Sequence, residues 1–166
     1  MARAWRLMHL LDTSIVLALR NARAGVAEPG LTAWASALPR ESLFISAITL
    51  HELEEQARTT RQDRAQWRTW IDDHVTRAFD GRVLPVDAAV VRRAGQLERG
   101  GARDGLLAAT ALEHRLTLAT LRPRAFKASR VKTFDPTGFV PSTQIEDWRQ
   151  AAQAAPAWIK NLFVRS

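Results

Sequence analysis

A chain of 166 residues with 46% hydrophobic content is long enough to form one domain with a substantial core, which excludes disorder over its whole length. The formal net charge of +7 favours polyanionic partners such as nucleic acid, or an acidic protein that covers the basic surface. Because the chain contains no cysteine, a disulfide framework, a thiolate zinc site and a cysteine nucleophile are all excluded.

The first part of the chain predicts a strand followed by a helix. An apolar run over 6–11 ends at Asp12, and the apolar residues over 14–22 then recur at helical spacing. The apolar run is interrupted by His9 and is far shorter than a bilayer span or the core of a signal peptide. We therefore expect neither secretion nor membrane insertion, and a cytoplasmic location.

The next elements alternate between helix and strand. We expect a short helix over 30–39 that Pro39 ends, a strand over 42–45, and a helix from Ser46 to about 58 with Ser46 as its cap. A second helix over 61–79 carries tryptophans and aliphatic residues every three or four positions. We interpret this aromatic face as core rather than as a base-stacking surface.

The rest of the main domain repeats the same alternation. The pattern predicts strands over 81–87, 115–120 and 130–134, a capped helix over 88–98, and a buried helix that begins at about 103. Such alternation predicts an α/β fold with a short parallel sheet of four or five strands and helices on both faces. Ligand sites in such sheets form beyond the carboxyl ends of the strands.

The C-terminal segment has its own helical pattern. Thr143 and Glu146 have capping-box spacing, and Pro156 interrupts the apolar stripe that follows. The stripe consists of Ile145, Trp148, Ala152, Ala155, Ile159 and Leu162. We therefore divide the chain into a main domain over 1–140 and a helical extension over 141–166 that packs on this domain or on a partner.

Three acidic residues stand out by their positions. Asp12 follows the first predicted strand, Glu52 lies in the first turns of a helix, and Asp104 precedes an apolar helical face. Each also has an ordinary explanation, since Asp12 and Asp104 can cap helices and Glu52 can be a surface acid.

The chemistry changes if the three acids meet at one sheet edge. Two carboxylates about 4 Å apart repel by about 4 kcal/mol at an effective dielectric constant of about 20, so such a cluster requires a cation or protons. All-oxygen ligands suit Mg²⁺ or Mn²⁺, which also bind phosphate oxygens. With a basic surface around the metal, the natural reaction is phosphodiester hydrolysis.

Several stretches carry a resemblance to a known family, with the acids at matching positions. They are "LLDTSIV" (10–16), "LFISAITLHEL" (43–53), "GRVLPVD" (81–87), "RDGLLAATALEHRLTLAT" (103–120) and, more weakly, "VKTFDP" (131–136). The sequence resembles the PIN-domain ribonucleases, specifically the VapC and FitB-like toxins of type II toxin-antitoxin modules.

This resemblance implies a PIN fold, an Mg²⁺-dependent endoribonuclease, a cognate antitoxin of the VapB type and pairing into a homodimer. Position by position, the family's acids fall on Asp12, Glu52 and Asp104, and Thr13 or Ser14 supplies a hydroxyl near the metal. We expect Asp12 and Asp104 to bind the metal and Glu52 to orient or deprotonate the attacking water.

The sequence departs from the family after Thr120. It reads "TLRPRAF", so Arg122 and Ala125 stand where polar or acidic residues are expected, and the fourth acid is missing. An arginine at this position adds a fixed positive charge that can partly neutralise the carboxylates. We therefore expect weaker or single-metal binding.

Three hypotheses follow. The first is a metal-dependent ribonuclease toxin, in which Ser14 and the basic residues Arg103, Arg122, Arg124, Lys127, Arg130 and Lys132 are candidates for RNA contacts. The second is a weakened PIN module that binds RNA or an antitoxin without efficient cleavage. The third, a dinucleotide-binding domain, is disfavoured because the first turn lacks the glycines that let a pyrophosphate approach a helix.

Overall fold

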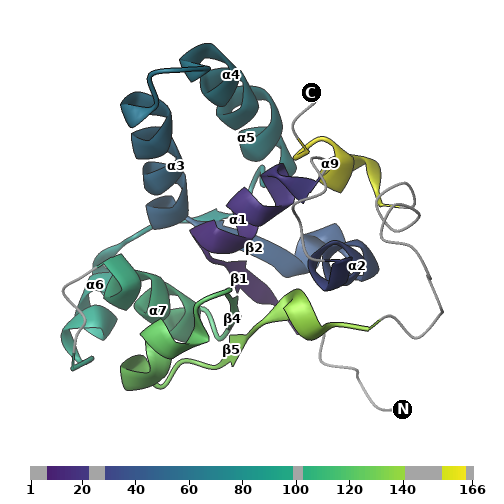
Figure 1. Cartoon of the computed structure of the whole chain (residues 1–166). Helices are drawn as coiled ribbons and strands as arrows, with labels where there is room; N and C mark the ends of the chain where they lie inside the picture. Colours follow the sequence, from purple (N-terminus) through teal and green to yellow (C-terminus); the bar gives the residue numbers. More distant parts are fainter. Residues whose placement is uncertain (1–6, 23–28, 99–102, 141–154, 164–166) are drawn as a thin grey trace.

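The computed structural model describes residues 7–22, 29–98, 103–140 and 155–163, and shows a parallel five-stranded sheet with helices on both faces (Figure 1). The strand order is β3-β2-β1-β4-β5, and every neighbouring pair is parallel. This confirms the predicted α/β class. The strands are β1 (His9–Leu11), β2 (Leu43–Ser46), β3 (Val83–Leu84), β4 (Thr117–Ala119) and β5 (Thr133–Phe134).

Helices and short helical turns connect the strands. They are α1 (Thr13–Arg20), α2 (Pro29–Ala37), η2 (Arg40–Ser42), α3 (Ala47–Thr59), α4 (Arg64–Thr69), η3 (Trp70–Val75), α5 (Thr76–Ala78), α6 (Ala88–Gly95), α7 (Arg103–Glu113), η4 (Pro123–Ser129), η5 (Pro136–Gly138) and α9 (Ala157–Lys160). Within the described ranges, each helix is too short or too polar to span a membrane.

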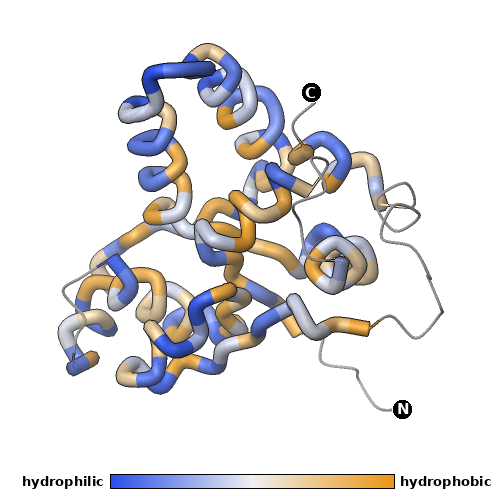
Figure 2. The backbone as a smooth tube through the Cα atoms, viewed as in Figure 1, coloured by the Kyte–Doolittle hydropathy of each residue, from blue (hydrophilic) through white to orange (hydrophobic). Residues whose placement is uncertain are grey.

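The sheet separates two hydrophobic layers because successive strand residues point to opposite faces. Leu10 and Leu118 pack with α7 and η4, while Leu11 and Ile45 pack with α1, α2 and the segment around α9. Figure 2 shows the apolar strands at the centre of the molecule and hydrophilic residues at the outer ends of α3 and α4. The sheet is therefore covered on both faces, as parallel sheets require.

Side-chain caps fix where two of the helices begin. The Ser46 hydroxyl accepts a hydrogen bond from the N–H of Ile48 at 3.1 Å and so starts α3 directly after β2. Asp87 accepts from the N–H of Val90 at 3.0 Å and starts α6. Both caps were expected from the sequence, and the first of them determines how Glu52 is presented.

The helix predicted over 61–79 is interrupted by a π-helical turn. The N–H of Thr76 bonds to the carbonyl of Ile71, five residues earlier, within η3. This wider turn brings Trp70 and Val75, also five residues apart, to the same buried side. Sequence periodicity alone did not reveal this change, because the apolar spacing also fits a regular helix.

The described part of the C-terminal segment packs on the main domain. The indole N–H of Trp70 donates to the carbonyl of Leu162 at 2.7 Å, and α9 begins directly after Pro156, beside α1 and α5 (Figure 1). The buried residues of this segment are Ala155, Ile159, Leu162 and Phe163. The predicted capping box at Thr143 and Glu146 and the first half of the apolar stripe lie outside the described residues.

Candidate functional site

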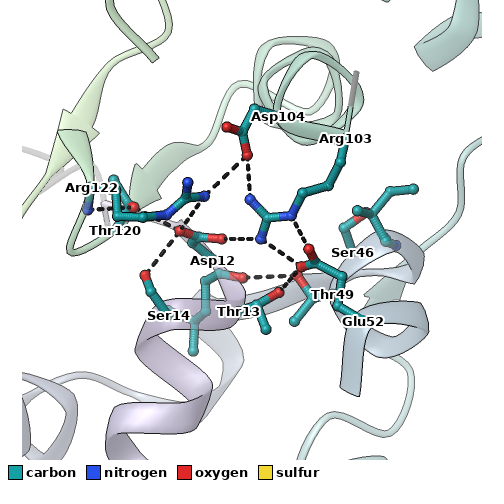
Figure 3. Close-up of polar contacts among 12 residues, drawn as sticks. Asp12, Thr13, Ser14, Ser46, Thr49, Glu52, Arg103, Asp104, Thr120 and Arg122 are labelled. Atoms are coloured by element: carbon teal, nitrogen blue, oxygen red, sulfur yellow. Dashed lines mark hydrogen bonds and ion pairs between the residues drawn. The ribbon is translucent and has the colours of Figure 1, made fainter. Parts of the chain in front are cut away.

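Three acidic residues from distant parts of the chain converge at the carboxyl end of the sheet (Figure 3). Asp12 directly follows β1, Glu52 lies on α3, and Asp104 lies in the first turn of α7. All three carboxylates contact the guanidinium group of Arg103. The cation that such a cluster requires is thus supplied by the chain itself.

Asp12 is the most deeply placed of the three. Its side chain is 0% exposed and accepts hydrogen bonds from the hydroxyls of Thr120 at 2.7 Å and Ser14 at 2.9 Å. Burial alone raises the pKa of Asp12, but the Thr120 hydrogen bond, the charge of Arg103 and the remaining donors outweigh it, so the pKa is lowered. Asp12 occupies the cap position of α1, yet its side chain accepts no hydrogen bond from the described N–H groups of that helix. Its carboxylate is directed to the site instead.

All three nitrogens of the Arg103 guanidinium contact the acids. Nη2 lies 2.8 Å from Oδ1 of Asp12 and 2.5 Å from Oε2 of Glu52, Nε also pairs with Glu52, and Nη1 pairs with the neighbouring Asp104. Burial lowers the pKa of Arg103, but the hydrogen bonds and charges of Glu52 and Asp12 raise it further than burial lowers it. Arg103 therefore stays charged at any physiological pH.

Arg122 adds a second positive charge at the rim. Its Nη2 lies 3.1 Å from Oδ1 of Asp104 and 3.6 Å from Oδ2 of Asp12, and the side chain is 46% exposed. The position that lacks the fourth acid thus carries a cation that partly neutralises the remaining acids. Ala125 is exposed, and its methyl group can neither donate nor accept a hydrogen bond.

Glu52 is held by its neighbours on β1 and α1. The hydroxyl of Thr13 donates to Oε2 of Glu52. One turn earlier on α3, the hydroxyl of the fully buried Thr49 donates to the carbonyl of Leu11 at 3.3 Å and ties the helix to the end of β1. Glu52 therefore faces Asp12 across the first turn of α1.

An open hollow of about 360 Å³ lies over these residues. It is lined by Thr13, Ser14, Leu17, Glu52, Arg103, Asp104 and Arg122. Asp104 also borders a second hollow of about 530 Å³, on whose wall Arg124 and Lys127 lie. Arg124, Lys127, Arg130 and Lys132 are exposed, so they are accessible to a polyanion.

The donors at this site fit a hard divalent cation. Carboxylate and hydroxyl oxygens are the ligands that Mg²⁺ and Mn²⁺ prefer, and the Arg103 guanidinium shows that the three acids can share one positively charged partner. Across the described ranges, however, no three His, Asp or Glu side chains are grouped closely enough to hold a metal as they stand. Each carboxylate contacts the Arg103 guanidinium instead.

Sequence reasoning missed two features of the site. Thr120, at the end of β4, donates to Asp12, and Arg103 bridges the acids instead of facing solvent. Thr120 could have been found from register, because Leu11 pairs with Ala119 and each is followed by a polar residue at the same sheet edge. The direction of a long arginine side chain leaves no comparable signal in the sequence.

Comparison with known proteins places the whole site inside one matched family region. The PIN domain family model matches residues 9–130, which include all the acids and both arginines of the site. The VapC ribonuclease Y4jK of Sinorhizobium fredii is 31% identical over 139 residues, covering 78% of this chain and 97% of that protein. Toxin FitB of Neisseria gonorrhoeae is 29% identical over 139 residues, covering 78% of this chain and 98% of that protein.

The fold shows the same relationship. The crystal structure of FitAcB from Neisseria gonorrhoeae superposes with a TM-score of 0.69 at 28% identity, covering 80% of this chain and all of the compared chain. A structure of FitAB bound to the IR36 DNA fragment gives a TM-score of 0.68 at 26% identity. With the parallel sheet, the acids at its edge and the matched region taken together, this chain belongs to the PIN domain family.

Proposed function

We propose that this protein is the toxin of a toxin-antitoxin module and acts as an endoribonuclease dependent on Mg²⁺ or Mn²⁺. One observation carries the proposal. Asp12, Glu52 and Asp104 come from three separate segments and converge on a single cationic group, the Arg103 guanidinium, at the carboxyl edge of the sheet. Its PIN-domain relatives include proteins named VapC ribonuclease and toxin FitB, which supports the same activity here.

In this proposal Asp12 and Asp104 hold the metal. When bound, the metal would supply positive charge that polarises the phosphodiester and lowers the pKa of water. Asp12 stays ionised because Thr120 and Ser14 donate to it. Glu52, oriented by the Thr13 hydroxyl, would position the attacking water and accept its proton.

The basic residues beside the site would hold the RNA backbone. Arg122 lines the same hollow as the acids, and Arg124 lines the adjoining one. Guanidinium groups bind phosphate oxygens in pairs of parallel hydrogen bonds, which suits them to a polyanionic chain. Ser14 and Arg103 line the same hollow and would complete this surface.

We further infer a cognate antitoxin of the VapB type and a homodimer. The similar solved structures include FitAcB and FitAB bound to DNA, which supports a two-component assembly. A basic chain with a formal charge of +7 also favours an acidic partner over its site.

One observation favours the alternative of a weakened module. Two guanidinium groups already contact the three acids, so metal binding must compete with them. In that case the protein would bind RNA or its antitoxin with little cleavage.

The test compares RNA cleavage by the purified full chain with that of two variants. Wild type should cleave an RNA pool in Mg²⁺ or Mn²⁺ but not in EDTA, and Asp12→Asn should lower the rate on the order of a hundredfold or more. The matched control is Asp72→Asn at an exposed acid of η3, which should cleave like wild type. If wild type cleaves no RNA in either metal, the binding-module alternative replaces the proposal; equal cleavage by Asp12→Asn and Asp72→Asn contradicts the assignment of Asp12.

A further inference from the structure

We propose that Arg103 is a built-in counter-ion that occupies the metal position and thereby sets the metal affinity of this protein. This inference rests on the proposed function, because it concerns the same three acids. It assigns to Arg103 a role different from contact with RNA, and it concerns binding of the cation rather than the cleavage step.

The first argument is the geometry of the contacts. The three guanidinium nitrogens of Arg103 together contact carboxylates from three different segments, so the planar group lies between Asp12, Glu52 and Asp104 (Figure 3). Arg122, by contrast, reaches only Asp104 and Asp12 and does so from the rim. Of these two arginines, Arg103 lies where a shared cation would lie.

The second argument is that one position cannot hold two cations. Asp12 is fully buried, and its neighbours Thr120 and Ser14 neutralise none of its charge, because a hydroxyl donates a hydrogen bond without adding a proton. A buried carboxylate needs an opposite charge in every state. Metal binding is therefore an exchange, in which the guanidinium leaves the acids as the divalent ion arrives.

The third argument is that the Arg103 side chain can move away from the acids into solvent. Its side chain is 29% exposed and forms part of the wall of the open hollow, whereas Asp12 beneath it is 0% exposed. Arg103 is also the first residue of α7, so its side chain can leave the site without disturbing the helix behind it. The exchange thus requires movement of one side chain rather than of the sheet edge.

The experiment measures Mn²⁺ affinity of the metal-free full chain by calorimetry, with free Mn²⁺ checked by electron paramagnetic resonance. Arg103→Gln removes the charge and keeps a hydrogen-bond donor, and it should bind Mn²⁺ about tenfold more tightly than wild type because the competing cation is gone. Arg103→Lys keeps the charge and should stay closer to wild type.

The matched control is Arg92→Gln, which removes one positive charge from an exposed position on α6. It corrects for the change in net charge and should alter Mn²⁺ affinity by no more than about twofold. Asp12→Asn identifies the site, since it should abolish the binding that Arg103→Gln strengthens.

A second measurement, thermal unfolding with and without Mn²⁺, keeps the test valid if Arg103→Gln is less stable than wild type. Without Arg103, only the more distant Arg122 contacts Asp12, so the metal-free variant should unfold at a lower temperature and gain more from saturating Mn²⁺ than wild type does. If the variant folds only with Mn²⁺, this also supports the exchange.

Two results overturn the inference in distinguishable ways. If wild type binds Mn²⁺ through Asp12 but Arg103→Gln binds no more tightly than Arg92→Gln, only the role of Arg103 is wrong. If neither wild type nor Arg103→Gln binds Mn²⁺, the metal site fails, and with it both this inference and the metal-dependent function.

Discussion

The guanidinium of Arg103 donates to the carboxylate of Asp12 at 2.8 Å across a sequence separation of 91 residues. This contact joins the first turn of α7 to the end of β1 and neutralises a carboxylate that water does not reach. Removing one partner of a fully buried pair typically destabilises a fold by about 3–5 kcal/mol, and the cost should be smaller here because Arg103 is 29% exposed. The site is thus part of what holds the two helical layers to the sheet.

Thr120→Val should raise the pKa of Asp12. The 2.7 Å hydrogen bond favours the ionised carboxylate, and valine keeps the shape of the side chain but cannot donate. We expect a loss of about 1–3 kcal/mol in the free energy of unfolding at neutral pH. The Asp12 carboxyl titration, followed by NMR on the metal-free protein, measures the shift.

The matched control is Thr110→Val, which removes a buried hydroxyl that donates to the carbonyl of Leu106 within α7. It should leave the Asp12 titration unchanged. Because the folded pKa of Asp12 lies below its ordinary value of 3.8, stability falls as the pH drops below that value, and this fall should be shallower in Thr120→Val. An unaltered Asp12 titration in that variant would contradict the account.

His9 should make the fold sensitive to mild acid. Its ring is buried between Trp34 and Phe134, and its Nδ1 has no hydrogen-bond partner among the described residues. Burial lowers its pKa below 6.5. The unfolded chain then binds the proton more readily, so stability is fully present above about pH 6.5 and is lost as the pH falls toward the folded pKa.

The slope of this loss is at most about 1.4 kcal/mol per pH unit. Urea unfolding at a series of pH values between 7 and 5 measures it. His9→Phe keeps an aromatic ring and should flatten the curve, whereas His51→Gln, at an exposed position on α3, should keep the wild-type slope. Equal slopes in wild type and His9→Phe would show that His9 is not the group responsible.

Trp70→Phe should weaken the attachment of the C-terminal segment. Phenylalanine keeps most of the buried ring but loses the N–H that donates to the carbonyl of Leu162. The carbonyl is then left without this partner, so we expect a loss of about 1–3 kcal/mol in the free energy of unfolding. Thermal unfolding measures it, with Trp67→Phe at the half-buried neighbouring ring as control. If Trp67→Phe lost more free energy of unfolding than Trp70→Phe, the hydrogen bond to Leu162 would not be the main source of the stabilisation.

Gly30→Ala should destabilise the packing of α2 on the turn at 136–139. A Cβ at this position would overlap the carbonyl oxygen of Thr137 and lie 2.9 Å from that of Pro136. Backbone atoms cannot move aside as a flexible side chain can, so we expect a loss of about 1–3 kcal/mol. Gly95→Ala is the control, because its Cβ would meet no described atom within 4 Å apart from its chain neighbours and the adjacent backbone of its own helix. Denaturant unfolding of the two variants gives the comparison.

The sequence was sufficient for the layout of the fold because the determinants of each element are local. The apolar run that became β1, the caps Ser46 and Asp87 and the proline before α9 each act within a few residues. The π-helical turn at Trp70 was missed because its apolar spacing also fits a regular helix, and the contact of its ring with Leu162 lies far along the chain. Packing of this kind has no local signature.

The candidate site likewise contains residues that the sequence predicts and one, Arg103, whose position it does not. Asp12, Glu52 and Asp104 could be predicted because each stands at a defined end of an element, and the topology brings those ends together. The position of Arg103 among them could not, because a side chain with several rotatable bonds can reach either solvent or the site. Which of the two it reaches is decided by the burial of Asp12, a property of the assembled fold.

The strand order β3-β2-β1-β4-β5 explains why the site has this location. From β1 the chain winds outward through β2 to β3 and then crosses back to β4, so the direction of winding reverses between β1 and β4. At such a topological switch point the connections leave toward opposite faces and open a crevice above the strand ends. Asp12 and Thr120 are the residues that directly follow these two strands. The crevice is therefore a consequence of the winding itself, and exchange of the residues around it can change its chemistry without changing its position.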